Sequence, residues 1–154
     1  MNIRLAYLAD YPEYIEPLAH LHHQEWGSFY ENWTFEIALQ ELLEAKKTVL
    51  PLTLIALEET QLLGSVSLIE DDWLKGFEHL SPWLASLFVL PAYRGKGVGK
   101  ALVKGVLREA RALHPQVYLF NHQQQAYYQS LGWQTLTQSE QQGKTMTVMV
   151  FKLR

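Results

Sequence analysis

The chain has 154 residues, a formal net charge of −3 and no cysteine, with 48% hydrophobic and 19% charged residues. The absence of cysteine excludes a disulfide framework, a thiolate metal site and a thiol nucleophile. The length and the ordinary composition predict a single globular domain over residues 1–154. No apolar run approaches the ~20 residues that span a bilayer, and the N-terminus has no signal-like apolar segment, so we expect a cytoplasmic protein that does not contact membranes.

The net charge hides a division between the two parts of the chain. Residues 1–93 hold 14 acidic and 4 basic side chains, a balance of −10, whereas residues 94–154 hold 2 acidic and 9 basic side chains, a balance of +7. A nucleic-acid binder is disfavoured, because most of the Trp and Tyr residues lie in the acidic part. The division fits an anionic cofactor on the second part and a cationic acceptor on the first. The alternative is two solvated faces that segregate by chance.

Taken in chain order, the first elements are a strand and two helices. Residues 2–8 alternate in hydrophobicity and predict a half-buried strand. Asp10 and Glu13 form a candidate capping box for a helix that Pro17 kinks or shortens. Residues 27–33 form an aromatic loop, and Thr34 is the expected N-cap of a second helix.

A hairpin and a central strand follow. Residues 52–58 and 62–69 read as its two strands, and Gly64 indicates a bulge or a close backbone approach. A polar and aromatic loop leads to residues 83–90, an apolar run typical of a strand buried on both sides. Strict alternation puts Trp83, Ala85, Leu87 and Val89 on one face and Leu84, Phe88 and Leu90 on the other, with Ser86 as the one polar interruption.

A glycine-rich turn, Arg94–Gly99, connects this strand to a helix with an apolar stripe at Val98, Leu102, Val106, Ala110 and Leu113. Backbone N–H groups and the helix dipole at such a junction favour an anion, and glycine lets a phosphate approach the backbone. The turn is not a Walker loop, because Arg94 and Ala101 replace its first Gly and its Ser/Thr. It also lacks the spacing of a dinucleotide fingerprint.

The remaining segments predict a strand at 116–120, a helix at about 123–130 and a closing hairpin at 133–136 and 145–153. The element order is β-α-α-β-β-β-α-β-α-β-β. This order predicts an α/β (α+β) fold with a mixed sheet of about seven strands and helices on both faces. The C-terminal strand is a candidate edge for pairing with another chain, and we expect a monomer or a homodimer.

Two motifs carry a family resemblance. Arg94, Gly97 and Gly99 occupy the fixed places of Arg-x-x-Gly-x-Gly, and residues 121–133, NHQQQAYYQSLGW, match N-x-x-A-x-x-[FY]-Y-x-x-x-G-[FW] except that Gln124 replaces Ala. The chain thereby resembles the GNAT superfamily of acyl-CoA-dependent N-acyltransferases over essentially its whole length. The resemblance implies the GNAT fold and acetyl-CoA as the donor. It also implies a cofactor site made of Leu87, Phe88, Val89, Arg94, Gly95, Lys96, Gly97, Val98, Gly99, Lys100, Asn121 and Tyr127.

Acyl transfer from a thioester to an amine needs a base for the ammonium, a donor for the carbonyl oxygen and an acid for the departing thiolate. By the resemblance, Tyr128 is the acid and a backbone N–H between Leu87 and Val89 is the oxyanion donor. The candidates for the base are Glu70, Asp71 and His79. Without a cysteine nucleophile, we expect direct attack in a ternary complex.

The acceptor wall is predicted from aromatic and acidic side chains, which suit a cationic amine. Its candidate members are Glu25, Trp26, Phe29, Tyr30, Asp72 and Trp83. No metal site is expected, because the adjacent His22 and His23 point about 100° apart on a helix. The sequence thus predicts an N-acetyltransferase for a small cationic amine. The alternatives are a protein or peptide N-acetyltransferase and a non-catalytic acyl-CoA-binding regulatory module.

Overall fold

The computed structural model describes all 154 residues and contains one seven-stranded sheet in the order β1-β2-β3-β4-β5-β7-β6. The strands are β1 (Arg4–Tyr7), β2 (Leu52–Glu58), β3 (Gln61–Ile69), β4 (Trp83–Val89), β5 (Gln116–Asn121), β6 (Gln134–Gln141) and β7 (Lys144–Lys152). The helices are α1 (Ile15–Trp26), α2 (Phe35–Leu43), α3 (Val98–Arg111) and α4 (Gln125–Ser130). The predicted order of elements and the mixed sheet are confirmed.

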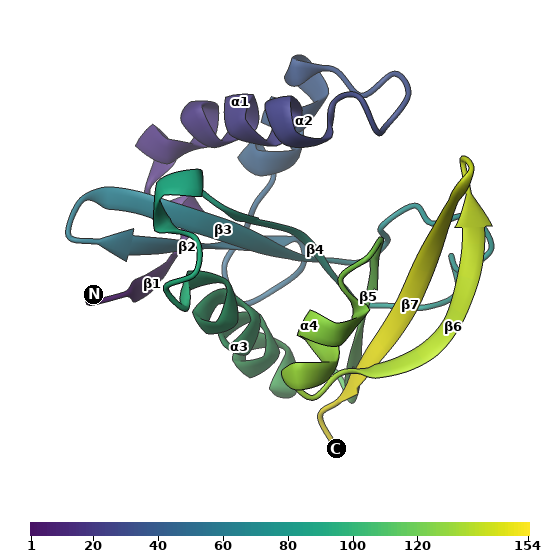
Figure 1. The fold of residues 1–154 in the computed structure, drawn as a ribbon. Helices are drawn as coiled ribbons and strands as arrows, with labels where there is room; N and C mark the ends of the chain where they lie inside the picture. Colours follow the sequence, from purple (N-terminus) through teal and green to yellow (C-terminus); the bar gives the residue numbers. More distant parts are fainter.

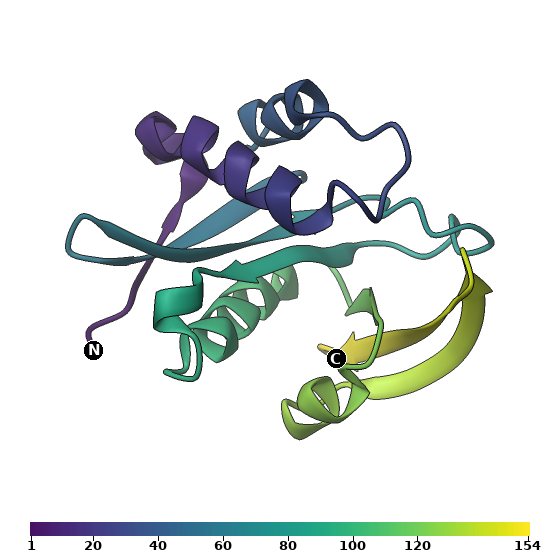
Figure 2. The same cartoon turned by 45° about the horizontal axis from the view of Figure 1, so that its top comes forward.

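The sheet separates two helical layers. Helices α1 and α2 cover one face, and α3 and α4 lie on the other (Figures 1 and 2). Strands β1 to β4 are antiparallel neighbours, β4 and β5 are parallel, and β5, β7 and β6 are antiparallel again. The parallel pair therefore lies in the middle of the sheet, with an antiparallel group on each side.

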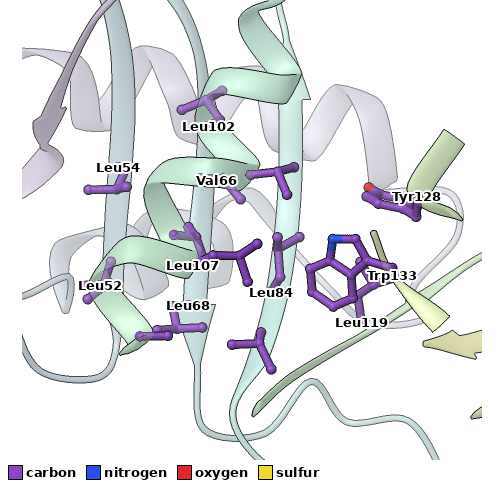
Figure 3. Packing of buried hydrophobic residues seen from close by; sticks show 14 of the residues in the cluster. Leu52, Leu54, Val66, Leu68, Leu84, Leu102, Leu107, Leu119, Tyr128 and Trp133 are labelled. Atoms are coloured by element: carbon purple, nitrogen blue, oxygen red, sulfur yellow. The ribbon is translucent and has the colours of Figure 1, made fainter. Parts of the chain in front are cut away.

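The larger core lies between the sheet and α3 (Figure 3). The predicted stripe of α3 is confirmed at Val98, Leu102, Val106 and Ala110, each at most 1% exposed. Full burial of a large aliphatic side chain contributes about 1.5–3 kcal/mol, so this stripe is a main source of cohesion. Leu113 was also predicted to be inward, but α3 ends at Arg111 and the side chain is 57% exposed.

The second helical layer has its own core between α1, α2 and strand β2. Leu18, Ala38 and Ile55 are at most 1% exposed there. The predicted N-cap of α2 is confirmed, since the Thr34 Oγ1 accepts a hydrogen bond from the Ile37 N–H at 3.2 Å. This cap satisfies one of the helix's free backbone donors and so determines where α2 begins after the aromatic loop.

The predicted start of the first helix is wrong. The chain passes through two short 3₁₀ turns, and α1 begins at Ile15 without a side-chain cap. Asp10 instead pairs with Lys47, with 2.6 Å between Oδ1 and Nζ. Pro17 lies in the first turn of α1, where its missing N–H removes no intrahelical hydrogen bond, so the proline is accommodated at the helix start.

A bulge in β4 corrects the predicted alternation of the central strand. Ser65 pairs with Phe88 while Ser67 pairs with Ala85, so Ser86 and Leu87 together oppose Val66. Ser86 has a φ of 57°, as bulged residues often do. Beyond the bulge the faces exchange, so that Phe88 packs beside His22 and Trp26 of α1. Leu87 and Val89 pack against the core on the α3 side.

Gly64 confirms the predicted close approach of the backbone at this bulge. A Cβ atom on Gly64 would lie 2.5 Å from the Phe88 carbonyl oxygen, a distance that no side chain allows. The glycine therefore lets β3 pack tightly against the distorted part of β4.

Strands β4 and β5 pair only at their beginning. Their one registered pair is Trp83 with Tyr118, and the Tyr118 N–H donates to the Pro82 carbonyl at 2.9 Å. Beyond this point the two strands diverge, as Figure 1 shows. The divergence opens the middle of the sheet next to the bulge.

The C-terminal strand is not an edge. β7 lies between β5 and β6, and the outer strand is β6, most of whose residues are exposed. None of the helices is long and apolar enough to cross a membrane.

Candidate active site

A cavity of about 520 Å³ occupies the gap between the diverging strands, and we call it the central cleft. Its lining comes from both helical layers: from α1, α2 and the loops 27–34 and 70–82 on one side, and from α4 on the other. The strand segments Leu84–Leu87 and Leu119–Asn121 form its middle. The structure brings together in this lining five of the predicted acceptor residues and the predicted acid: Glu25, Trp26, Phe29, Tyr30, Asp72 and Tyr128.

Tyr128 is held rigidly at the cleft. It lies on α4, is 5% exposed, and packs edge-on against Tyr127 and Trp133 with ring centroids 5.1 Å and 6.2 Å away. Figure 3 shows it beside Trp133 at the margin of the larger core. Tyr128 lines the cleft, and its hydroxyl makes no hydrogen bond within the protein. Burial, together with the neighbouring Tyr127, raises the pKa of Tyr128, so the group is protonated and able to donate at neutral pH.

The glycine turn (residues 94–100) forms a second cavity, of about 560 Å³. Gly95 and Gly97 have φ angles of 75° and 86°, and a Cβ atom on either residue would point into open space. Gly97 is the N-cap of α3, so the first N–H groups of that helix have no intrahelical partner. These N–H groups, Arg94 and Lys100 form a cradle whose positive potential and shape fit a phosphate group.

Arg94 is anchored at the end of β4. Its Nε donates to the Val89 carbonyl at 2.8 Å, and its guanidinium carbon lies 5.7 Å from the centre of the Phe88 ring. The terminal nitrogens of Arg94 make no hydrogen bond within the chain and remain available. Lys96 is exposed and does not line the cavity, unlike Val98, Gly99 and Lys100.

Of the other predicted cofactor residues, all but Phe88 line one of the two cavities. Leu87 lines the central cleft and Val89 lines the glycine-turn cavity, whereas the Phe88 ring turns away toward α1 because of the bulge. Tyr127 lines the glycine-turn cavity, and its hydroxyl would lie 3.0 Å from a Cβ atom on Gly99.

Asn121 belongs to the lining of the cleft, but its amide is occupied. Its Oδ1 accepts from the Gln124 N–H at 2.9 Å, and its Nδ2 lies 3.3 Å from the Met149 sulfur. Gln124, the residue that departs from the family motif, is exposed and precedes α4. Its side chain therefore does not disturb the packing of α4 against the core.

Four of the residues predicted as bases or acceptor contacts do not line the cleft. Glu70 and His79 are exposed loop residues outside its lining. Asp71 shapes the loop instead, since its Oδ1 accepts from the Trp73 N–H at 2.8 Å. Trp83 is 1% exposed and its Nε1 donates to the Leu80 carbonyl at 2.7 Å, so it is a core residue and cannot contact an acceptor.

Several residues of the cleft were not predicted. Trp33, Glu41, Trp73 and Lys144 all line it. Glu41 lies on α2, and its Oε1 accepts a hydrogen bond from the Trp33 Nε1 at 2.7 Å. The sequence offered one related signal, the aromatic loop 27–33 that contains Trp33.

The acidic side chains of the cleft have perturbed ionisation. Desolvation raises the pKa of Asp72 well above its usual value of 3.8, and the nearby charges of Glu41 and Asp71 raise it further. Desolvation also raises the pKa of Glu41, although the hydrogen bond from Trp33 opposes the shift. Burial and the charge of Asp72 raise the pKa of Tyr30. The cleft thus holds two carboxyl groups whose ionised forms are disfavoured by poor solvation and by each other.

His22 supports the floor of this region from α1. It is 4% exposed, and its Nε2 lies 3.0 Å from the Ser65 Oγ on β3. Burial lowers the pKa of His22 from 6.5 to about 4, so the ring is neutral at physiological pH. Its neutral ring packs edge-on against Trp26, which lines the cleft, at a centroid distance of 5.1 Å.

Comparison with solved structures finds the same fold in several proteins. An aminoglycoside 6′-N-acetyltransferase solved with coenzyme A is 16% identical, with a TM-score of 0.75 and coverage of 100% of this chain and 98% of the other. The PaiA N-acetyltransferase of Thermoplasma acidophilum, also solved with coenzyme A, is 19% identical with a TM-score of 0.70 and 99% coverage of both chains. A GNAT-family acetyltransferase of Streptococcus pneumoniae is 15% identical, with a TM-score of 0.72 and coverage of 98% and 99%.

A search of curated protein sequences finds no match. A sequence model of the acetyltransferase (GNAT) family, by contrast, matches residues 15–133 and so spans α1, the central strands, the glycine turn and α4. This match covers more than half of the chain and includes both sequence motifs. The protein belongs to the acetyltransferase (GNAT) family.

Proposed function

We propose that the protein transfers an acetyl group from acetyl-CoA to a primary amine by direct attack in a ternary complex, and that the acceptor is a small cationic amine. The observation that carries this proposal is Tyr128, whose hydroxyl makes no hydrogen bond within the protein and which shares the lining of one cleft with aromatic and acidic residues of the other helical layer. Two substrates entering from the two helical layers would meet at that hydroxyl.

The glycine turn is assigned to the donor. A pyrophosphate would accept hydrogen bonds from the first N–H groups of α3 and would be neutralised by Arg94 and Lys100. The pantetheine arm would then follow the opening between β4 and β5 toward Tyr128. The two structural neighbours solved with coenzyme A support this choice of donor.

The chemistry follows from the groups at the middle of the cleft. The amine nitrogen attacks the acetyl carbonyl, and a backbone N–H near the Ser86 bulge stabilises the oxyanion. The carbon–sulfur bond then breaks, and the departing thiolate takes the proton of the Tyr128 hydroxyl. The tyrosinate regains a proton from the positively charged amide nitrogen of the intermediate or from solvent, so the catalytic cycle closes without net proton loss from the enzyme.

The acceptor must lose a proton before it attacks. None of Glu70, Asp71 and His79 lines the cleft, so we assign this proton to water in the cleft. Deprotonating an ammonium of pKa about 10 at pH 7 costs about 4 kcal/mol, which a moderately active enzyme tolerates. The value of kcat/KM is therefore expected to rise with pH through the neutral range.

The proposal is tested by a thiol-release assay with acetyl-CoA and a panel of diamines and polyamines, aminoglycosides, amino acids and peptides. Turnover with cationic small amines supports it. Turnover with peptides alone would show that the acceptor is a peptide and not a small cationic amine. If no acceptor releases thiol while acetyl-CoA still raises the melting temperature, the protein is a non-catalytic acyl-CoA-binding module and the proposal fails.

A further inference from the structure

The end of the central cleft on the α1 and α2 side is lined by aromatic and acidic side chains. We call this end the outer subsite, and its residues are Tyr30, Trp33, Glu41, Asp72 and Trp73. They come from three separate segments: the loop after α1, helix α2, and the loop between β3 and β4. Tyr128 belongs to the core on the opposite side of the sheet, so the outer subsite and the reacting groups lie at different ends of the cleft.

The aromatic rings of the outer subsite are held in place before any ligand binds. Tyr30 and Trp33 pack edge-to-face, with ring centroids 5.9 Å apart at 64°. The Trp33 indole donates to Glu41, and the Trp33 carbonyl is 3.1 Å from the His23 Nε2. Trp73 is 82% exposed at the rim of the cleft, an unusual position for so large an apolar side chain. All three rings line the cavity, and the faces of aromatic rings attract cations.

The two carboxylates of the outer subsite have no cation in the protein. The molecule contains one lysine–carboxylate ion pair, Lys47 with Asp10, and one contact of His20 with Glu16, and neither involves Glu41 or Asp72. Asp72 forms no hydrogen bond within the chain although its surroundings desolvate it strongly. Lys144, the one cationic side chain in the lining, stacks over the Phe29 ring at 4.8 Å. Two close carboxylates in a poorly solvated site are unfavourable, and a bound cation would relieve that cost.

The reacting nitrogen does not suit this position, because it must be neutral when it attacks and must lie near Tyr128. We infer that the acceptor carries a second cationic group, separate from the amine that is acetylated, and that the outer subsite binds this second group between its aromatic rings and carboxylates. This inference rests on the proposed function, and it narrows the acceptor from a cationic amine to a dication or polycation.

Matched acceptors test the inference. Linear diamines of four to eight carbons are compared with the corresponding monoamines and amino alcohols, which have the same length and one charge. We expect kcat/KM for the best diamine to exceed that of its monoamine about 10- to 100-fold, the range that a cation held by aromatic faces and carboxylates provides. Equal values for diamines and monoamines across the series would overturn the inference and leave the proposed function intact.

Variants locate the effect. Glu41→Gln and Asp72→Asn remove one charge each, and Gln retains the oxygen that accepts from Trp33. Both are expected to lower the ratio of diamine to monoamine kcat/KM by about tenfold. Glu36→Gln is the matched control, because Glu36 is exposed on the same helix outside the cleft and its variant should keep the wild-type ratio. A ratio that falls equally in all three variants would overturn the assignment.

A binding measurement keeps the inference testable if no amine is acetylated. Hexane-1,6-bis(trimethylammonium) has two cations and cannot be acetylated, and its affinity is measured by calorimetry. We expect Asp72→Asn to weaken its binding at least about tenfold relative to the wild type and to Glu36→Gln. Equal affinities in all three proteins would overturn the cation subsite. Absent turnover together with selective binding would instead refute the proposed function alone.

Discussion

At the scale of single residues, the Tyr128 hydroxyl is the group on which the proposed chemistry depends. Replacing Tyr128 with Phe removes the proton donor but leaves the ring that packs against Trp133. We expect kcat to fall about 100-fold or more, the usual contribution of a general acid, while the dissociation constant of acetyl-CoA changes little. Steady-state kinetics and calorimetry measure the two quantities.

Tyr118→Phe is the control for the Tyr128 variant, because Tyr118 is on neighbouring β5 and lines neither cavity. An unaltered kcat in Tyr128→Phe would reduce Tyr128 to a packing residue. A fall of similar size in both variants would point to a general effect on the fold.

His22 makes the stability of the protein depend on pH. Its pKa is about 4 in the folded state and 6.5 in the unfolded chain, so between these values the unfolded state binds more protons. The contribution of His22 to the free energy of unfolding is present above pH 6.5 and is lost as the pH falls toward 4. The free energy of unfolding is expected to drop by about 2.5 kcal/mol from this group between pH 7.5 and pH 4.5.

The contribution of His22 is measured by urea unfolding at the two pH values. His22→Gln keeps a polar side chain beside Ser65 but does not titrate, so its loss of stability on acidification should be smaller by about that amount. Identical losses in the wild type and the variant would show that the pKa of His22 is the same in the folded and unfolded states.

At the scale of elements, the junction of β4, the glycine turn and α3 determines donor binding. Gly97→Trp places a ring in the open space of the cradle. We expect the affinity for acetyl-CoA to fall at least about 100-fold, because the ring would occupy the phosphate position. The left-handed φ of Gly97 adds a strain of about 1 kcal/mol to the variant, which lowers the melting temperature.

Gly76→Trp is the control that separates the effect of backbone strain from the effect of blocking the phosphate position. Gly76 also has a positive φ, 91°, and open space around it, but it lies in the loop before β4. Its variant should lose similar stability and keep the wild-type affinity for acetyl-CoA. Retained affinity in Gly97→Trp would remove the glycine turn from the donor site.

At the scale of the whole molecule, the charge division of the sequence becomes a division across the sheet. Residues 10–47, which include α1 and α2, hold 8 acidic and 2 basic side chains, a balance of −6. Residues 94–111, which include the glycine turn and α3, hold 1 acidic and 6 basic, a balance of +5. The two helical layers, which lie on opposite faces of the sheet (Figure 2), therefore carry opposite net charges. These charges would guide an anionic donor and a cationic acceptor to different sides.

Salt should weaken the electrostatic attraction of the two substrates to these layers. Raising the ionic strength from 0.02 M to 0.3 M reduces the Debye length from roughly 20 Å to roughly 6 Å, so the KM values for acetyl-CoA and for a diamine are both expected to rise several-fold. The value of kcat should change little, because the reacting groups are buried. Unchanged KM values would show that short-range contacts alone bind the two substrates.

The sequence by itself was sufficient for the features that depend on local patterns. The element order, the apolar stripe of α3 and the Thr34 cap follow from periodicity and capping chemistry, which involve neighbouring residues. The motifs around Gly97 and Tyr128 identified the family for the same reason. Strict alternation failed in β4, because a bulge at one residue exchanges every face that follows it.

Only the tertiary structure decided which side chains share the cleft. Glu41 and Asp72 are separated by a hairpin strand pair in the sequence, and they line one cavity because α2 and the loop before β4 fold over the same side of the sheet. Trp83 and Asp72 looked equally suitable as acceptor contacts, yet one is buried in the core and the other faces the cleft. The physical reason is that burial depends on long-range packing, whereas sequence patterns record mainly local geometry.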